Sequence, residues 1–219
     1  MKKILLGVLF VLLAPLALAA GGGHNPYVVE APISITDKAQ LQRGAQLFVN
    51  YCYGCHSMKY LRYERMATDL DIPLELLGGN LMFNTDKPGS PMLNGLDPVQ
   101  AKKWFGVAPP DLSLEAKLRG ADWVYSYLIS FYPDPSRPWG VNNHVFPNVG
   151  MPHIMADMQR TLPEDEFKSR MADLTAFLEY AAEPIQATRQ AMGFFVIGFL
   201  LILLLFAWLM KREFWKDVH

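Results

Sequence analysis

Cys52-Tyr53-Gly54-Cys55-His56 contains both cysteines of this 219-residue chain and follows the pattern C-x-x-C-H. Two thiols at this spacing can each form a thioether with one vinyl group of a haem, and the adjacent histidine is then held beneath the iron as its proximal ligand. A redox dithiol does not require the histidine, and a zinc site needs two more ligands, for which no further cysteine exists. The motif therefore predicts one covalently attached haem c at Cys52, Cys55 and His56.

The residues before this motif predict the helix that carries it. Apolar residues recur at positions i, i+4, i+7 and i+11 from Leu41 to Cys52. Thr36 or Asp37 can cap the start of such a helix. We therefore expect an amphipathic helix that places Cys52 on its apolar face, toward a haem packed in the core.

The sixth iron ligand has to come from elsewhere in the chain, as a methionine or a second histidine, unless the position stays open. Met151 is favoured, because Gly150 and Pro152 on either side of it predict a loop with a restricted backbone. His153 and Met155 are the alternatives, and Met155 is more simply explained as a core residue. Ligation by histidine and methionine is typical of electron-transfer haems.

A second amphipathic helix is predicted after this loop. Thr161 and Glu164 form a capping-box pattern, apolar residues recur at helical spacing over residues 167–181, and Pro184 ends the helix. Residues 69–110 are rich in Gly, Pro, Asn and Asp, which predicts irregular backbone with short helices. The predicted fold is mainly α, a class I cytochrome c-like haem domain with long loop insertions.

The composition gives no sign of nucleic-acid binding, and much of the apolar sequence lies at the two ends of the chain. Lys and Arg number 20 against 21 Asp and Glu, for a formal net charge of -1, whereas 51% of residues are hydrophobic. Residues 1–19 combine a basic start, an apolar run and Ala17-Leu18-Ala19, the pattern of a signal peptide cleaved near Ala19. An uncleaved anchor is the alternative interpretation of this segment.

The second apolar run predicts one C-terminal transmembrane helix. Gln190 to Met210 carries no charge and would span about 30 Å as a helix, the thickness of the hydrocarbon layer. A buried core helix is the less favoured interpretation of so long a run. We expect an anchor at residues 186–210 in contact with membrane lipid, and a basic cytoplasmic tail at residues 211–219. The haem domain, residues 20–185, is then expected on the periplasmic side of a bacterial inner membrane.

Several longer segments resemble the cytochrome c1 family, the haem c subunits of cytochrome bc1 (ubiquinol:cytochrome c reductase) complexes, and are similar to its compact proteobacterial forms. The resemblance covers nearly the whole chain after the signal peptide. Its most specific parts are the PPDLS segment, the FPNVGMP segment and the C-terminal anchor, at residues 109–113, 146–152 and 186–210. The segments around the haem motif and RGADWVY at residues 119–125 also match.

The resemblance implies roles for individual residues. Cys52 and Cys55 would hold the haem, and His56 and Met151 would ligate its iron. Pro110, in the family's PPDL segment, would pack against the haem.

A basic residue of the family pairs with a haem propionate. In this sequence the residue falls at Lys117 or Arg119. We favour Arg119, because a guanidinium group can bind a carboxylate through two hydrogen bonds.

The resemblance also implies electron transfer rather than bond-making chemistry by this chain. A Rieske iron–sulfur protein would be the electron donor, a soluble or tethered c-type cytochrome the acceptor, and cytochrome b the neighbour of the anchor. One alternative is another membrane-anchored monohaem cytochrome that serves a terminal oxidase or reductase. A haem peroxidase or gas sensor with an open iron position is the other, and it would leave Met151 with only a packing role.

Overall fold

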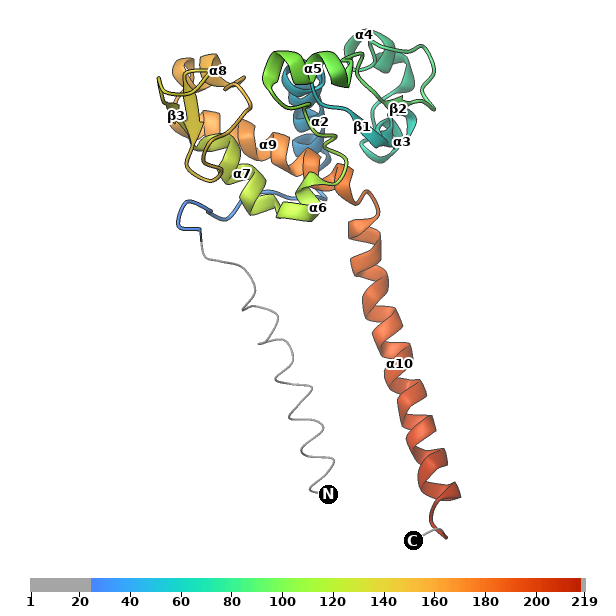
Figure 1. Cartoon of the computed structure of the whole chain (residues 1–219). Coiled ribbons are helices and arrows are strands. Elements are labelled where there is room, and N and C mark those ends of the chain that lie inside the picture. The colour runs from blue at the N-terminus through green and yellow to red at the C-terminus, as the bar shows by residue number, and fades with distance from the viewer. Residues whose placement is uncertain (1–24, 218–219) are drawn as a thin grey trace.

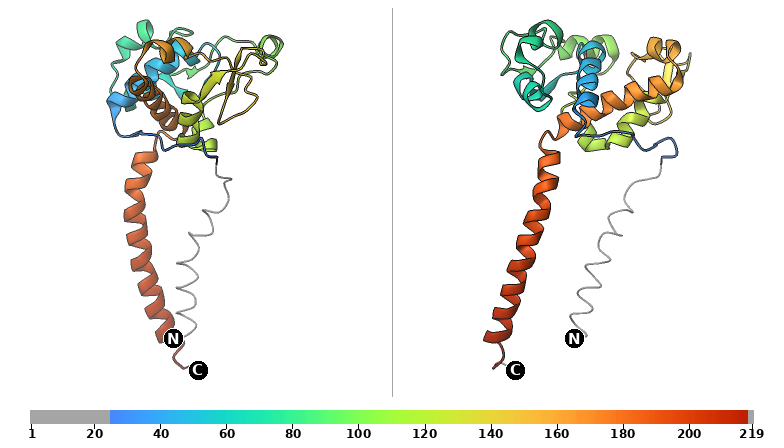
Figure 2. Two further views of the ribbon diagram at one scale, coloured as in Figure 1. Left: turned by 90° about the vertical axis from the view of Figure 1, so that its left-hand side faces the viewer. Right: turned by 180° about the vertical axis from the view of Figure 1, so that it is seen from behind.

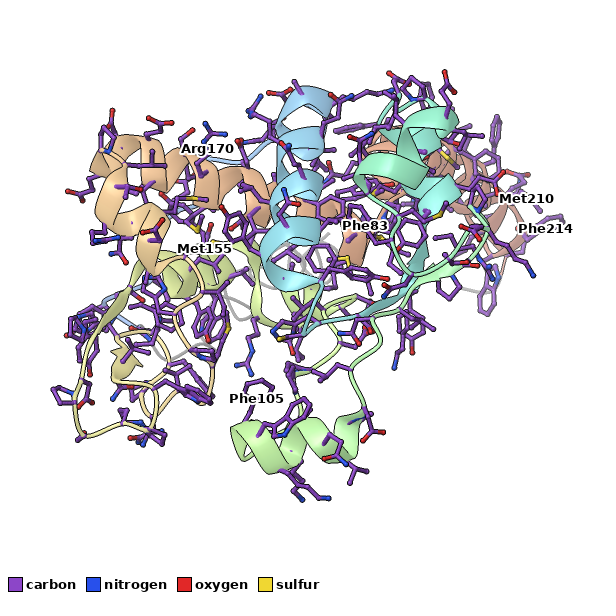
Figure 3. All side chains as sticks on the ribbon, turned by 90° about the horizontal axis from the view of Figure 1, so that it is seen from above. Phe83, Phe105, Met155, Arg170, Met210 and Phe214 are labelled. Carbon is purple, nitrogen blue, oxygen red and sulfur yellow. The ribbon has the colours of Figure 1, made fainter. Side chains whose placement is uncertain are left out.

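Helices α2 (Lys38–Leu47) and α9 (Glu164–Ala182) cross at the centre of the molecule and contribute many residues to its core (Figures 1 and 3). The computed structural model describes residues 25–217, so the predicted signal peptide at 1–19 lies outside the described residues. The chain is mainly helical, as the sequence predicts. The other helices are the π-helical turn η1 (Phe48–Cys52), α3 (Tyr63–Asp69), η2 (Leu74–Leu76), α4 (Leu77–Asn80), α5 (Pro98–Phe105), α6 (Glu115–Arg119), α7 (Ala121–Ile129), α8 (Ala156–Thr161) and α10 (Gln186–Phe214).

Two short antiparallel ribbons complete the described fold. β1 (Met58–Arg62) pairs with β2 (Pro91–Met92), and a register shift interrupts the pairing. β3 (Phe131–Pro133) pairs regularly with β4 (Val141–Asn143). Within residues 69–110, where turn-forming residues predict irregular backbone with short helices, the structure has η2, α4, β2 and α5.

The start of α2 follows the sequence prediction. The Asp37 carboxylate accepts hydrogen bonds from the backbone N–H groups of Ala39 and Gln40, at 3.0 and 3.2 Å. This N-cap satisfies two donors that have no partner inside the helix. Leu41 and Ala45 are buried on the face that meets α9.

The two core helices approach each other closely because of a glycine. A Cβ atom placed on Gly44 would lie 2.1 Å from the backbone oxygen of Asp173 and 2.7 Å from the Cβ of Phe177. Arg43, the preceding residue, donates from Nε and Nη2 to the two carboxylate oxygens of Asp173, at 2.7 and 2.9 Å. The Asp173 side chain is only 3% exposed, so this two-pronged ion pair compensates a charge on the buried side of α9.

The capping box predicted for α9 is wrong. Pro163 stands at the N-cap, and Thr161 is the last residue of α8, where its hydroxyl donates to the Asp157 carbonyl at 2.8 Å. Leu162 has an extended backbone conformation, which separates α8 from α9. The first turn of α9 is instead stabilised by its run of acidic residues, which interact favourably with the helix dipole. The predicted buried face, including Phe167 and Met171, is confirmed.

A buried pair of tyrosines ties the irregular middle segment to the cysteine-bearing turn. Tyr63 donates through its hydroxyl to the Tyr53 hydroxyl at 2.7 Å, and Tyr53 donates to the carbonyl of Leu93 at 2.5 Å. Asn84 also donates to that carbonyl, at 3.1 Å. The middle segment is therefore held to this turn by hydrogen bonds between polar groups of the protein itself.

Helix α10 projects away from the rest of the described fold (Figure 2). Within residues 25–217 it is the one helix long and apolar enough to cross a membrane, and its apolar side chains are exposed. The helix runs to Phe214 and therefore continues beyond the predicted span.

Glu183, the C-cap residue of α9, links α6 to the start of α10. Its carboxylate forms ion pairs with Lys117 of α6 and with Arg189 in the first turns of α10. The two cations lower the pKa of Glu183 from 4.5 to about 2. Because this pKa is lowered on folding, the stabilisation is present at neutral pH and is lost as the pH falls from about 4.5 toward 2.

Replacement of Gly44 by alanine is expected to destabilise the α2–α9 crossing. The new methyl group would meet the α9 backbone, which cannot rotate away, so the free energy of unfolding should fall by about 1–3 kcal/mol, as in other overpacked cores. Denaturant unfolding of the full chain in detergent measures this change. The control is Gly95→Ala, whose added Cβ meets no described atom within 4 Å. Equal stability of the two variants would contradict the close crossing.

Substitution Glu183→Gln is expected to loosen the junction with α10, because Lys117 and Arg189 lose the charge they share. Amide hydrogen exchange over residues 183–189 should become several-fold faster at neutral pH. The control is Glu166→Gln, which removes the exposed Glu166–Arg170 pair elsewhere on α9. Unchanged exchange in the Glu183 variant would show that the ion pairs do not hold the junction.

Candidate functional site

The two cysteines lie where α2 ends in the wider turn η1. The backbone N–H groups of Cys55 and His56 both donate to the Cys52 carbonyl, at 3.0 and 2.8 Å. This turn buries Cys52 and leaves Cys55 partly exposed. Burial, together with the nearby Cys55, raises the pKa of the Cys52 thiol to about 12. The predicted helix therefore delivers Cys52 to the interior, although its last turn is π-helical rather than α-helical.

His56 is oriented by a backbone carbonyl. Its Nδ1 lies 2.7 Å from the carbonyl oxygen of Pro110 and donates to it, because a carbonyl can only accept. The other ring nitrogen, Nε2, is then left unprotonated in the neutral ring. Burial lowers the pKa of His56 and favours this neutral form. An imidazole held in this way presents a lone pair suited to a metal ion.

A cavity of about 260 Å³ lies beside this histidine. Its walls come from η1, from the segment before α6, from α7, from the loop before α8, and from Leu174 and Leu178 of α9. The lining is mostly apolar, with aromatic side chains on several sides. Phe105 closes one side from α5 and points toward the body of the domain (Figure 3). The residues that the sequence predicts for the site and that line this cavity are Cys52, Cys55, His56, Pro110, Arg119 and Met151.

The loop that carries Met151 is fixed from outside the cavity. Arg137 donates from Nη2 to the carbonyl oxygens of Asn148 and Val149, at 2.8 and 3.3 Å. Asn148 has φ 62°, a left-handed conformation that asparagine tolerates better than most residues. The loop can therefore turn sharply and place Met151 at the cavity wall.

The three residues considered for the sixth ligand occupy different environments. Met151 lines the cavity, whereas Met155 is 3% exposed in the hydrophobic core. His153 stacks on Phe131 with ring centres 4.6 Å apart, and its Nε2 lies 2.5 Å from the Gln159 side-chain oxygen. Of the three residues, Met151 is therefore the best placed to ligate an iron in the cavity.

The two basic residues considered for a haem propionate, Lys117 and Arg119, also lie in different environments. Lys117 pairs with Glu183 near the start of α10, whereas Arg119 lines the cavity. Arg119 donates to Glu115 at 3.1 Å, and its guanidinium carbon lies 4.4 Å from the centre of the Trp123 ring. The guanidinium group is therefore held at the cavity by an ion pair and a cation–π contact.

Tyr127 is a site residue that the sequence reasoning missed. It lines the cavity, and its hydroxyl donates to the Met151 sulfur at 3.4 Å. Burial raises the pKa of Tyr127, so the hydroxyl keeps its proton at neutral pH. A usable signal existed in the spacing of Trp123 and Tyr127, which are four residues apart and share one face of α7.

The donor set and the cavity fit a covalently bound haem. The cavity combines two thiols, an imidazole nitrogen and a thioether sulfur with apolar walls that suit a flat macrocycle. Arg119 offers a positive group to an acidic substituent. A zinc site has less support, because within residues 25–217 no group of three His, Cys, Asp or Glu side chains could hold a metal ion.

Known proteins match the chain over its whole length. The Cytochrome C1 family matches residues 27–76 and 82–218. Cytochrome c1 of Allochromatium vinosum is 44% identical in an alignment of 246 positions that covers 100% of both chains. The ammonia monooxygenase gamma subunit of Nitrosomonas europaea is 36% identical, again over 100% of both chains, and cytochrome c1 of Rhodospirillum rubrum is 31% identical over 83% of both. The chain belongs to the cytochrome c1 family.

Proposed function

We propose that this chain carries one haem c and acts as the electron-transfer haem subunit of a quinol:cytochrome c oxidoreductase. Membership of the cytochrome c1 family implies the covalently bound haem. The observation that carries the proposal is the single cavity in which Cys52, Cys55 and His56 meet Met151. When bound, the haem supplies one-electron chemistry at its iron.

The residues at the cavity have distinct roles in this proposal. Cys52 and Cys55 form the thioethers, while His56 and Met151 supply the nitrogen and sulfur ligands. Pro110 orients His56 through its carbonyl, as well as lining the cavity. Arg119, which lines the cavity beside Glu115, would bind a haem propionate.

A haem iron held by two protein side chains, His56 and Met151, would suit electron transfer. His56 is already oriented, and Met151 lies on a loop held by Arg137, so little rearrangement is needed when the electron moves. A thioether ligand raises the reduction potential, which fits an acceptor of electrons from a high-potential Rieske iron–sulfur protein. The chain would then pass electrons to a soluble or tethered c-type cytochrome.

The proposed location is the bacterial inner membrane, with the haem domain on the periplasmic side. Support comes from the exposed apolar helix α10, from the basic residues that follow it, and from the signal-peptide pattern at 1–19. We propose residues 20–185 as the haem domain, 186–210 as the anchor and 211–219 as the cytoplasmic tail. Helix α10 would pack against cytochrome b and membrane lipid.

The experiment below distinguishes the proposed function from two other assignments. A membrane-anchored monohaem cytochrome could serve a terminal oxidase or reductase instead. The Nitrosomonas europaea relative is named as the gamma subunit of an ammonia monooxygenase. Neither is favoured by a specific contact in the site.

The test of the proposal is gentle extraction of native membranes through an affinity tag on this chain. Co-purification of a b-type haem and a Rieske electron paramagnetic resonance signal, with quinol reducing the c haem, is the expected result. Oxidase centres or ammonia-oxidising activity in place of these signals would assign the chain to a different complex.

Substitution Met151→Ala is expected to open one axial position. The reduction potential should fall by on the order of 0.1 V, within the roughly 0.8 V that axial ligands can span, and the reduced protein should bind carbon monoxide. Redox titration and absorption spectra of the full chain in detergent measure both effects. The control is Met155→Leu, which conserves volume at the alternative methionine and should change neither. A potential unaffected by loss of Met151 would instead support an open iron position.

The number of haems is tested through the two cysteines. The intact chain should contain one haem per polypeptide, as measured by the alkaline pyridine spectrum and protein mass. Cys55→Ala should leave one thioether and shift that spectrum toward that of non-covalent haem, and the double variant of Cys52 and Cys55 should retain no covalent haem. More than one haem per intact chain would contradict the proposal.

A further inference from the structure

Aromatic rings form a continuous stack along one face of α7 and into β3. Trp123 and Tyr127 are stacked with ring centres 5.3 Å apart and planes 7° apart, and Phe131 meets Tyr127 edge-on at 5.2 Å. Arg119 lies over the outer face of Trp123 at one end. His153 lies flat on Phe131 at the other end. The ring of Tyr127 is therefore held between two aromatic neighbours.

Both ends of the tripeptide Met151-Pro152-His153 contact this stack. The Tyr127 hydroxyl donates to the Met151 sulfur at 3.4 Å, within the range of a hydrogen bond to sulfur. The His153 ring lies parallel to Phe131, with an angle of 2° between the planes. Pro152 stiffens the backbone between the two contacts. In Figure 1 the same neighbourhood is visible where α7 leads into β3 below α8.

The Tyr127 contact reaches the atom that the proposed function assigns to the iron. A thioether sulfur has two lone pairs, so it can accept one hydrogen bond and donate to a metal at the same time. The hydrogen bond withdraws electron density from sulfur, and the sulfur then donates less to a bound iron. Because weaker donation disfavours the ferric state, the contact raises the reduction potential.

We propose that Tyr127 is a positioning residue for Met151: its hydroxyl holds and polarises the thioether sulfur, and the aromatic stack on α7 holds the Tyr127 ring in place. This inference rests on the proposed function, because it takes Met151 as an iron ligand. According to this inference, the hydrogen bond from Tyr127 raises the reduction potential above the value that the two iron ligands would give without it.

Tyr127→Phe tests the inference, because it removes one oxygen and keeps the ring in the stack. Loss of one ordinary hydrogen bond, about 1 kcal/mol, should favour the ferric form about five-fold, which corresponds to a fall in potential of about 40 mV. The charge-transfer band from sulfur to ferric iron should shift as well. Redox titration and ferric spectra of the haem-loaded full chain in detergent measure both, and haem content and circular dichroism check folding.

The matched control is Tyr125→Phe. Tyr125 lies on the same helix and is 5% exposed, and it is not among the described residues that line the cavity. Its substitution should leave the potential and the charge-transfer band unchanged. An equal shift in both tyrosine variants would overturn the inference, because it would then reflect packing of α7 rather than the contact with sulfur.

A double-mutant cycle separates this inference from the proposed function. In a Met151→His background an imidazole nitrogen replaces the sulfur, so Tyr127→Phe should have no comparable effect there. The same shift in both backgrounds, or no shift with Met151 present, would overturn the role of Tyr127. Failure of the proposed ligation is a different result: Met151→Ala would then leave the potential and spectrum unchanged.

Discussion

The contact between Gly44 and the backbone of Asp173 is the constraint on which the rest of the fold depends. It lets α2 and α9 cross at backbone distance, and the ion pair of Arg43 with Asp173 fixes the crossing beside it. This crossing fixes the position of α2 against α9, and therefore the position of the turn η1 that carries Cys52. Leu174 and Leu178 follow on α9 and form part of the cavity wall. One close helix packing thus places both the cysteine-bearing turn and the apolar surface opposite it.

The remaining groups of the site are oriented by contacts outside the cavity. Pro110 holds His56, Arg137 holds the Met151 loop, and Tyr127 reaches the Met151 sulfur. The separation in sequence ranges from 11 residues between Arg137 and Asn148 to 54 residues between His56 and Pro110. Such support reduces the freedom of the two proposed iron ligands before a haem is bound, which lowers the structural change that accompanies transfer of an electron.

Lys117 and Arg119 illustrate how neighbouring charges on one short helix take different roles. Lys117 turns to Glu183 and links α6 to the start of α10, whereas Arg119 turns to the cavity and lies over Trp123. The helix that lines the site therefore also contacts the junction with the proposed anchor. A change in the direction of α10 would act on α6 through Glu183. The α6 residue that Glu183 contacts is Lys117, which lies two positions before the cavity-lining Arg119.

Local sequence patterns were enough to predict the haem-attachment motif and the order of the main helices. The spacing of Cys52, Cys55 and His56, the cap at Asp37, the buried face of α9 and the apolar run in α10 are local patterns, and local patterns can be read without knowing what packs against them. The capping box at Thr161 failed because the pattern occurs at the end of α8, where Pro163 starts a new helix. The sequence favoured Met151 and Arg119 over the alternatives, but their separation from Met155 and Lys117 needed the tertiary structure, as did the contact of Tyr127 with Met151, because these depend on how different segments meet.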